Sequence, residues 1–213
     1  MTGPSATETT ETAEATETAT TPDSEDQPMA AAAQRTDARR NRQRLLAAAQ
    51  ESFTEAGPEA SLNEIARRAG VGPGTLYRHF PTRGALLAAV LDERVERLCA
   101  TADRLLATEP ADTALADWLH AFVAHARVNQ GLGGALLMEA EGSLGTDCHR
   151  RIRNAATAVL SHARSHGTAR PDLAADDLLR LALGVALATP QPEQADQSER
   201  LLGLVLDAVH RAA

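Results

Sequence analysis

The sequence predicts an all-α protein, and its composition and periodicity are the grounds for this. Of its 213 residues, 43% are hydrophobic but only 2% are aromatic. Alanine and leucine supply most of the apolar content, and both favour helices over sheets. Apolar residues also recur at helical spacing along most of the chain, between short segments rich in glycine and proline.

Charge is distributed unevenly along a chain whose net charge is −8. Residues 1–34 contain acidic residues and no basic ones, whereas residues 35–94 contain ten arginines against seven acidic residues. Residues 95–213 are acidic again. The basic segment is therefore where a polyanionic partner is expected to bind.

The first 34 residues consist mainly of Thr, Glu, Ala and Pro. Such a segment cannot bury enough apolar surface to offset its ordering entropy, so residues 1–34 are predicted to be a disordered acidic tail. Met29 is an alternative start of translation. Competition of the tail with DNA for the basic segment is a weaker alternative.

Several classes of protein are disfavoured. Two cysteines, Cys99 and Cys148, suggest a reducing cytoplasm. There is no apolar run of about 18 residues, so no membrane span or membrane partner is expected. The first residues lack the basic start and apolar core of a secretory signal.

The basic segment predicts three short helices. The first starts near Thr36 or Asp37 and ends at Gly57. Ser61 and Glu64 form a capping box that opens a second helix, and Gly70 suits the left-handed conformation of a tight turn after it. Pro73 can open a third helix. Two helices joined by so short a turn form a helix-turn-helix, whose second helix can lie in the major groove of DNA.

Longer helices are predicted after this segment. Thr82 can cap a fourth helix that runs from about Arg83 to Leu106. Further helical patterns cover about 111–129, 131–142, 147–166, 171–188 and 195–212, and glycine or proline clusters separate them.

The string from Leu62 to Phe80, LNEIARRAGVGPGTLYRHF, resembles the signature of the TetR family. The preceding pattern from Arg44 through Phe53 to Gly57 resembles the first helix of that family, and Thr82-Arg83 resembles the start of its fourth. The likeness covers about residues 38–90. It implies a DNA-binding domain at 35–94 with three helices, followed at 95–213 by a helical domain for ligand binding and dimerisation.

The resemblance also implies individual roles. Leu76 and Phe80 pack in the core, and the start of the third helix reaches base edges. Arg83 stands where the family often has a lysine that contacts phosphate. At position 84 the family often has an acidic residue, whereas this chain has a glycine. The DNA-binding residues expected are Arg39, Arg40, Arg42, Ser61, Leu62, Pro73, Gly74, Thr75, Tyr77, His79 and Arg83.

Other readings of these residues stay open. Tyr77 could be a core aromatic, although its position next to Leu76 turns it about 100° away. His79 could be a capping or packing histidine. The arginines of the first helix could form a solvated face without phosphate contacts.

The second domain is less informative. The resemblance implies an effector cavity, for which we expect apolar lining by Leu91, Trp118, Phe122, Met138 and Leu160; ordinary core is the alternative. It also implies a dimer bundle built from the last two helices. Their apolar residues, including Leu183 and Leu202, outnumber what one buried face requires.

The remaining chemistry-bearing residues form no strong motif. His162 and His166 have a spacing that can bind zinc, but a solvated pair is favoured. Cys148 could sense redox state if His149 or Arg150 depressed its pKa, although an inert thiol is favoured. No cofactor, metal or enzymatic activity is expected.

The function expected is a repressor that a small molecule releases from a palindromic operator bound by a homodimer. The alternatives are a helical enzyme or carrier and a helical adaptor that binds only protein. An adaptor leaves residues 62–80 unexplained, and the sequence shows no clear set of converging polar groups for an enzyme.

Overall fold

The computed structural model describes the backbone of residues 26–139 and 143–210, and the side chains of 34–130, 147–191 and 193–210. Within these ranges the regular structure is helical, apart from an isolated bridge between Ala169 and His210. The helices are α1 (Asp26–Ala56), α2 (Leu62–Arg68), α3 (Pro73–His79), α4 (Arg83–Thr108), α5 (Ala111–Glu139), α6 (Ser143–Ser165), α7 (Ala175–Ala188), η1 (Pro192–Gln194) and α8 (Ala195–Val209). The all-α prediction is confirmed.

Helix α1 begins ten residues earlier than its predicted start near Thr36. Residues 26–34, which the sequence analysis placed in the predicted tail, are helical in the structure, while residues 1–25 lie outside the described part of the chain. A run of four alanines follows Met29. Since alanine is the best helix former, this run extends the helix that the arginine-rich segment begins.

Two further boundaries differ from the prediction. Helix α5 continues through the Gly131–Gly134 cluster, where a break was expected, so 111–129 and 131–142 are not separate helices. A helical glycine costs only about 1 kcal/mol relative to alanine and need not end a long helix. Helix α7 starts at Ala175 rather than at residue 171, and an Arg170–Asp172 ion pair of 2.7 Å lies in the turn before it.

The first buried cluster joins α1, α2 and α3 to the beginning of α4. Leu45, Phe53 and Ile65 are almost fully buried, and Leu76 and Phe80 of the third-helix region lie with them. Leu76 and Phe80 stand four positions apart, which places both side chains on one face, so α3 is fixed to the core along that face. Its other faces stay available.

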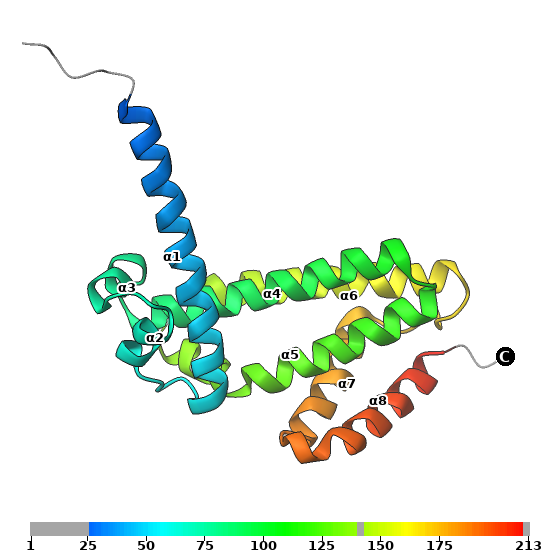
Figure 1. The fold of residues 1–213 in the computed structure, drawn as a ribbon. Coiled ribbons are helices and arrows are strands. Elements are labelled where there is room, and N and C mark those ends of the chain that lie inside the picture. The colour runs from blue at the N-terminus through cyan, green and yellow to red at the C-terminus, as the bar shows by residue number, and fades with distance from the viewer. Residues whose placement is uncertain (1–25, 140–142, 211–213) are drawn as a thin grey trace, which may run out of the picture. The chain divides into compact units, whose positions relative to one another are not determined.

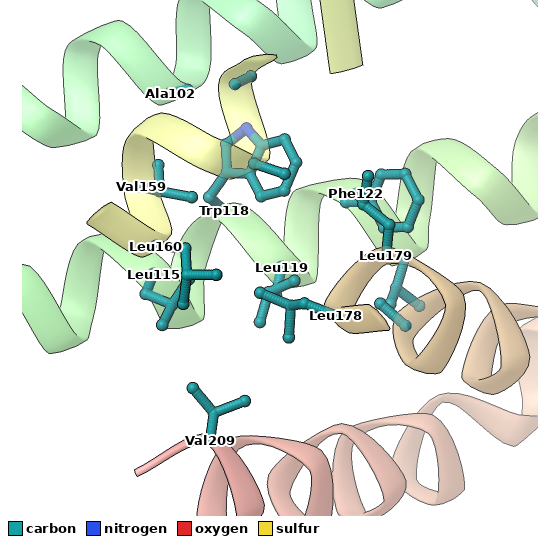
Figure 2. Close-up of a cluster of buried hydrophobic side chains, with 14 of the residues drawn as sticks. Ala102, Leu115, Trp118, Leu119, Phe122, Val159, Leu160, Leu178, Leu179 and Val209 are labelled. Carbon is teal, nitrogen blue, oxygen red and sulfur yellow. The ribbon is translucent and has the colours of Figure 1, made fainter. Parts of the chain in front are cut away.

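The second buried cluster lies among the later part of α4 and helices α5 to α8. Figure 1 shows α4, α5 and α6 side by side, and Figure 2 shows Trp118 and Phe122 of α5 at the centre of this cluster. The Trp118 indole N–H donates to the Leu98 carbonyl at 3.2 Å, and its ring stacks on Phe122 at 5.8 Å. The cluster is therefore tied to α4 by a buried hydrogen bond as well as by apolar contact.

Helix α4 belongs to both clusters. Leu86, Leu87 and Val90 pack in the first cluster, whereas Leu98, Ala102 and Leu105 pack in the second. The proposed domain boundary after residue 94 falls between these two groups. A change in the position of α4 therefore reaches both clusters.

Candidate nucleic-acid interface

The turn between α2 and α3 is defined by caps at both ends. Ser61 caps α2, and its Oγ accepts a bond from the Glu64 N–H at 3.4 Å. The predicted N-cap at Ser61 is therefore confirmed. The Glu64 carboxylate, which a capping box would direct to the Ser61 N–H, instead accepts two bonds from Arg67.

Gly70 closes α2 with a φ of +67°, in the left-handed region that residues with a side chain rarely adopt. Its N–H donates to the Arg67 carbonyl, and the Val71 N–H donates to the Ala66 carbonyl, each at 3.0 Å. Gly72 then caps α3, and Pro73 takes its first position. The sequence prediction of a tight glycine turn between two helices is confirmed.

Helix α3 presents a polar face opposite its buried one. Tyr77 is 48% exposed, so it is not a core aromatic. Pro73 and Gly74 at the helix start are exposed, while Thr75 and His79 are half-buried. The start of α3 therefore offers small, accessible residues, and its end offers two polar rings.

One arginine of α1 contacts the residue that follows α3. Arg39, Arg40 and Arg42 are exposed, and the Arg42 guanidinium lies over the Phe80 ring with its Cζ 5.3 Å from the centroid. Ser61 is exposed, and Leu62 is half-buried against the first cluster. Because Phe80 follows α3 directly, the cation–π contact places positive charge beside the end of that helix.

Arg83 has a structural role that the sequence did not indicate. Its Nη1 donates to the Pro58 carbonyl at 2.8 Å and to the Ala60 carbonyl at 2.6 Å. The side chain is half-buried and connects the start of α4 to the loop between α1 and α2. Its expected phosphate contact remains a prediction. Because Nη1 is used by the two carbonyls, the contact would have to come from the other N–H groups of the guanidinium.

Two family models match the chain. "Bacterial regulatory proteins, tetR family" covers residues 45–90, and "Transcriptional regulator SbtR-like, C-terminal domain" covers residues 110–211. The crystal structure of a TetR transcriptional regulator from Streptomyces coelicolor is 40% identical, with a TM-score of 0.73, over 81% of this chain and 99% of that one. The chain belongs to the TetR family of transcriptional regulators. It is a DNA-binding regulator, and α2 and α3 are its helix-turn-helix.

Other relatives agree with this assignment. A TetR regulatory protein from Mycobacterium vanbaalenii is 33% identical over 83% of this chain and 99% of that one, with a TM-score of 0.69. A helix-turn-helix-type regulator of Staphylococcus aureus is 43% identical over 63 residues, which are 29% of this chain. That match spans only 34% of the curated relative, so it bears on the DNA-binding region alone.

The second domain of this TetR-family regulator contains a cavity of about 620 Å³ between α5, α6 and α7. Apolar side chains line much of it, among them Phe122, Ile152 and Leu179. Polar side chains line the rest: His125, Asn129, Gln130, His149, Asp176 and Arg180. The cavity is therefore amphipathic, as is common for small-molecule sites.

Among the expected lining residues whose side chains the structure describes, Phe122 alone borders this cavity. Trp118 and Leu160 are buried in the second cluster, because their side chains are used for packing, and Leu91 packs against the first cluster. The side chain of Met138 lies outside the described residues. The sequence analysis missed His125, Asn129 and Gln130, although His125 and Asn129 stand one turn apart on α5, as do Phe122 and Ala126.

The cysteines and the histidine pair show no sign of reactive or metal chemistry. Burial raises the pKa of the Cys148 thiol, with Asp92 adding to the rise, so the depressed pKa that a sensor needs is absent. His166 Nδ1 lies 2.9 Å from the carbonyl of His162. Among the described side chains, no three His, Cys, Asp or Glu residues gather in a way that could hold a metal ion. No described helix is long and apolar enough to cross a membrane.

Four leucines of α7 and α8 are exposed. Leu181, Leu183 and Leu187 of α7 and Leu204 of α8 are each more than 40% exposed. Leu202 is only 1% exposed, because it packs inside its own subunit. Its inclusion among surplus apolar residues was wrong. Leu183 borders the cavity, and Leu204 remains available for an interface.

Proposed function

We propose that this regulator is a homodimeric repressor that a small-molecule effector releases from a palindromic operator. The observation that carries the DNA-binding part is the polar, accessible face of α3 on a helix whose other face is anchored by Leu76 and Phe80. A recognition helix must be rigid on one side and free on the other, and this arrangement provides both.

The proposed contacts divide into two groups. Pro73, Gly74 and Thr75 at the start of α3 approach base edges, where sequence can be read. Contacts to phosphate are assigned to Arg39, Arg40, Arg42, Ser61, Leu62, Tyr77, His79 and Arg83, and these fix orientation and supply most of the salt dependence. Leu62 has no polar side chain, so its backbone N–H is the donor expected to contact phosphate.

Dimerisation is proposed through α7 and α8. Exposed leucines such as Leu181 and Leu204 are unfavourable in water, and covering them in a partner subunit removes that cost. A two-fold dimer would place two copies of α3 about 34–36 Å apart, in successive major grooves of a palindromic site. Family regulators act as dimers on DNA, which supports this part of the proposal.

Effector release is proposed to act through the cavity between α5, α6 and α7. A ligand that binds one arrangement of the helices better than another shifts the population toward the first. Release from DNA follows if the favoured arrangement no longer fits both half-sites. The regulator is proposed to act in the cytoplasm and to carry out no catalytic step.

Selection of genomic DNA fragments by the purified full chain tests the proposal. The expected result is enrichment of a palindrome, with a duplex affinity that falls steeply as salt rises. Fluorescence anisotropy with the enriched and a scrambled duplex gives the specificity ratio, expected to be about 10³ or more. Fragments without a shared sequence, or equal affinity for both duplexes, would contradict the proposal.

A further inference from the structure

A buried cation lies on α4 between the two clusters. Arg94 is only 9% exposed, and its Nη1 donates to Asn129 Oδ1 of α5 at 2.8 Å. Its Nη2 donates to the Gln50 carbonyl at 3.1 Å and to Thr54 Oγ1 at 3.0 Å, both on α1. One guanidinium therefore joins the DNA-binding domain to the helix that lines the cavity.

All of these partners of Arg94 are neutral. Among the described side chains no carboxylate lies within ion-pair distance of it, and Asp92 on the same helix pairs with Arg151 instead. The pKa of Arg94 is lowered by burial and, after that, by the neighbouring charge of Arg97. Burying a charge without a counter-ion is costly, so this position is favourable for an anion.

Arg94 lines one of two neighbouring hollows that have lining residues in common. A groove of about 320 Å³ between α4 and α5 is lined by Arg94 and Arg97, and the cavity of about 620 Å³ lies beyond α5. His125 and Asn129 line both hollows. His125 and Asn129 therefore stand between the cavity and the groove that Arg94 lines.

The charge around this wall is positive. Burial and, secondarily, Arg94 and Arg97 lower the pKa of His125 to about 4, so the ring is neutral at pH 7. The acidic residue in the cavity lining, Asp176, stands on α7 with Arg180 in the same lining. An anionic group at the wall would therefore meet two arginines and no facing carboxylate among the residues lining the groove.

We propose that the effector is an organic anion with an apolar body, and that its anionic group replaces the Asn129 carboxamide on Arg94. The inference rests on the proposed function, because it takes the cavity as the effector site. The apolar body lies against Phe122, Ile152 and Leu179. When the guanidinium turns toward the anion, its bonds to Gln50 and Thr54 weaken, and α4 loosens its hold on the end of α1.

The charge of the ligand can be tested on the unmodified chain. Decanoate, decanamide and decylammonium share an apolar chain and differ in charge. Trp118 emission reports their binding, because its ring stacks on Phe122 of the cavity wall. Decanoate is expected to bind about 10- to 100-fold more tightly than the other two compounds. Equal affinities, a preference for decylammonium, or no binding of decanoate would overturn the inference.

Two variants test the residues. Arg94→Met is expected to reduce decanoate affinity to that of decanamide, whereas Arg104→Met, which removes an exposed arginine from the same helix, keeps the preference. Asn129→Asp places a carboxylate on Arg94 and is expected to abolish the preference without loss of thermal stability. Asn129→Asp therefore tests the role of Arg94 even if Arg94→Met does not fold. A parent-like preference in Asn129→Asp would overturn the inference.

Operator binding of the same preparations separates this inference from the proposed function. Decanoate is expected to lower operator affinity of the parent and to have little effect on Asn129→Asp. If the parent binds the operator but shows no decanoate preference, only the charge inference fails. If it binds no operator at all, the proposed function fails.

Discussion

The Nη1 atom of Arg83 lies 2.6 Å from the carbonyl oxygen of Ala60, and the same atom donates to Pro58. This contact joins residues more than twenty positions apart and fixes the loop that precedes α2. The position of the helix-turn-helix thus depends on a side chain at the start of α4. The contact gives Arg83 a role in folding that is separate from any contact with DNA.

Arg83→Ala is expected to lower the free energy of unfolding by about 1.5–3 kcal/mol, since bonds from a charged donor are lost. Thermal unfolding of the free protein measures this, with Arg104→Ala as the control for removal of an exposed arginine. If Arg83 also contacts phosphate, the slope of log affinity against log salt falls by about one unit per contact. An unchanged melting temperature would contradict the structural role, and an unchanged slope would remove Arg83 from the DNA contacts.

Gly70 and Gly74 provide a matched pair on the helix-turn-helix. Gly70→Ala is expected to destabilise the protein by about 1–2 kcal/mol, because alanine is strained at a φ of +67°. Gly74 lies within α3, and a Cβ there would meet open space. Gly74→Ala is therefore expected to stabilise the fold by about 0.5–1 kcal/mol. Chemical denaturation of both variants measures the difference, and equal effects would contradict the turn geometry.

If α7 and α8 form the dimer interface, replacing exposed leucines on them with glutamate should disrupt the dimer. Leu181→Glu with Leu204→Glu is expected to give folded monomers in sedimentation, because both side chains are exposed within one subunit. Operator affinity should fall by about 100-fold or more as the second half-site is lost. Val128→Glu changes an exposed apolar residue on α5 and should leave the dimer intact. Persistent dimers of the double variant would place the interface elsewhere.

His125 predicts a loss of stability in mild acid. Its pKa is lowered from 6.5 to about 4, so the unfolded chain takes up a proton at a higher pH than the folded one. Stability is therefore complete above pH 6.5 and is lost as the pH falls toward 4, by about 2 kcal/mol at pH 5. Unfolding at pH 7 and pH 5 should show a smaller difference in His125→Gln than in the parent. His120→Gln, at an exposed position, is the control; a parent-like difference in His125→Gln would contradict the account.

The helix-turn-helix was predictable because its signals are local. The cap at Ser61, the glycine at position 70 and the spacing of Leu76 and Phe80 each act within one or two turns of helix. The length of α5 was not predictable from the sequence. Glycines usually end helices, but they are tolerated in a helix that neighbouring helices support.

The existence of a cavity could be predicted, but the residues that line it could not. Trp118 and Phe122 share a face of α5, and the sequence does not reveal that one packs in the core while the other borders the cavity. The neutral environment of Arg94 depends on α1, α4 and α5 meeting, which is a tertiary property. Leu202 was misassigned for the same reason, because an apolar residue on α8 can face its own core or a partner.

The reading of DNA by α3 is tested most directly at Thr75. Titrations of the parent and Thr75→Ala against operator variants and a scrambled duplex, at several salt concentrations, separate sequence reading from charge. The account predicts that Thr75→Ala changes the preference among operator variants by about 1–3 kcal/mol and leaves the salt slope unchanged. A parent-like preference, with all of the change in affinity shared by the scrambled duplex, would contradict the placement of α3 in the major groove.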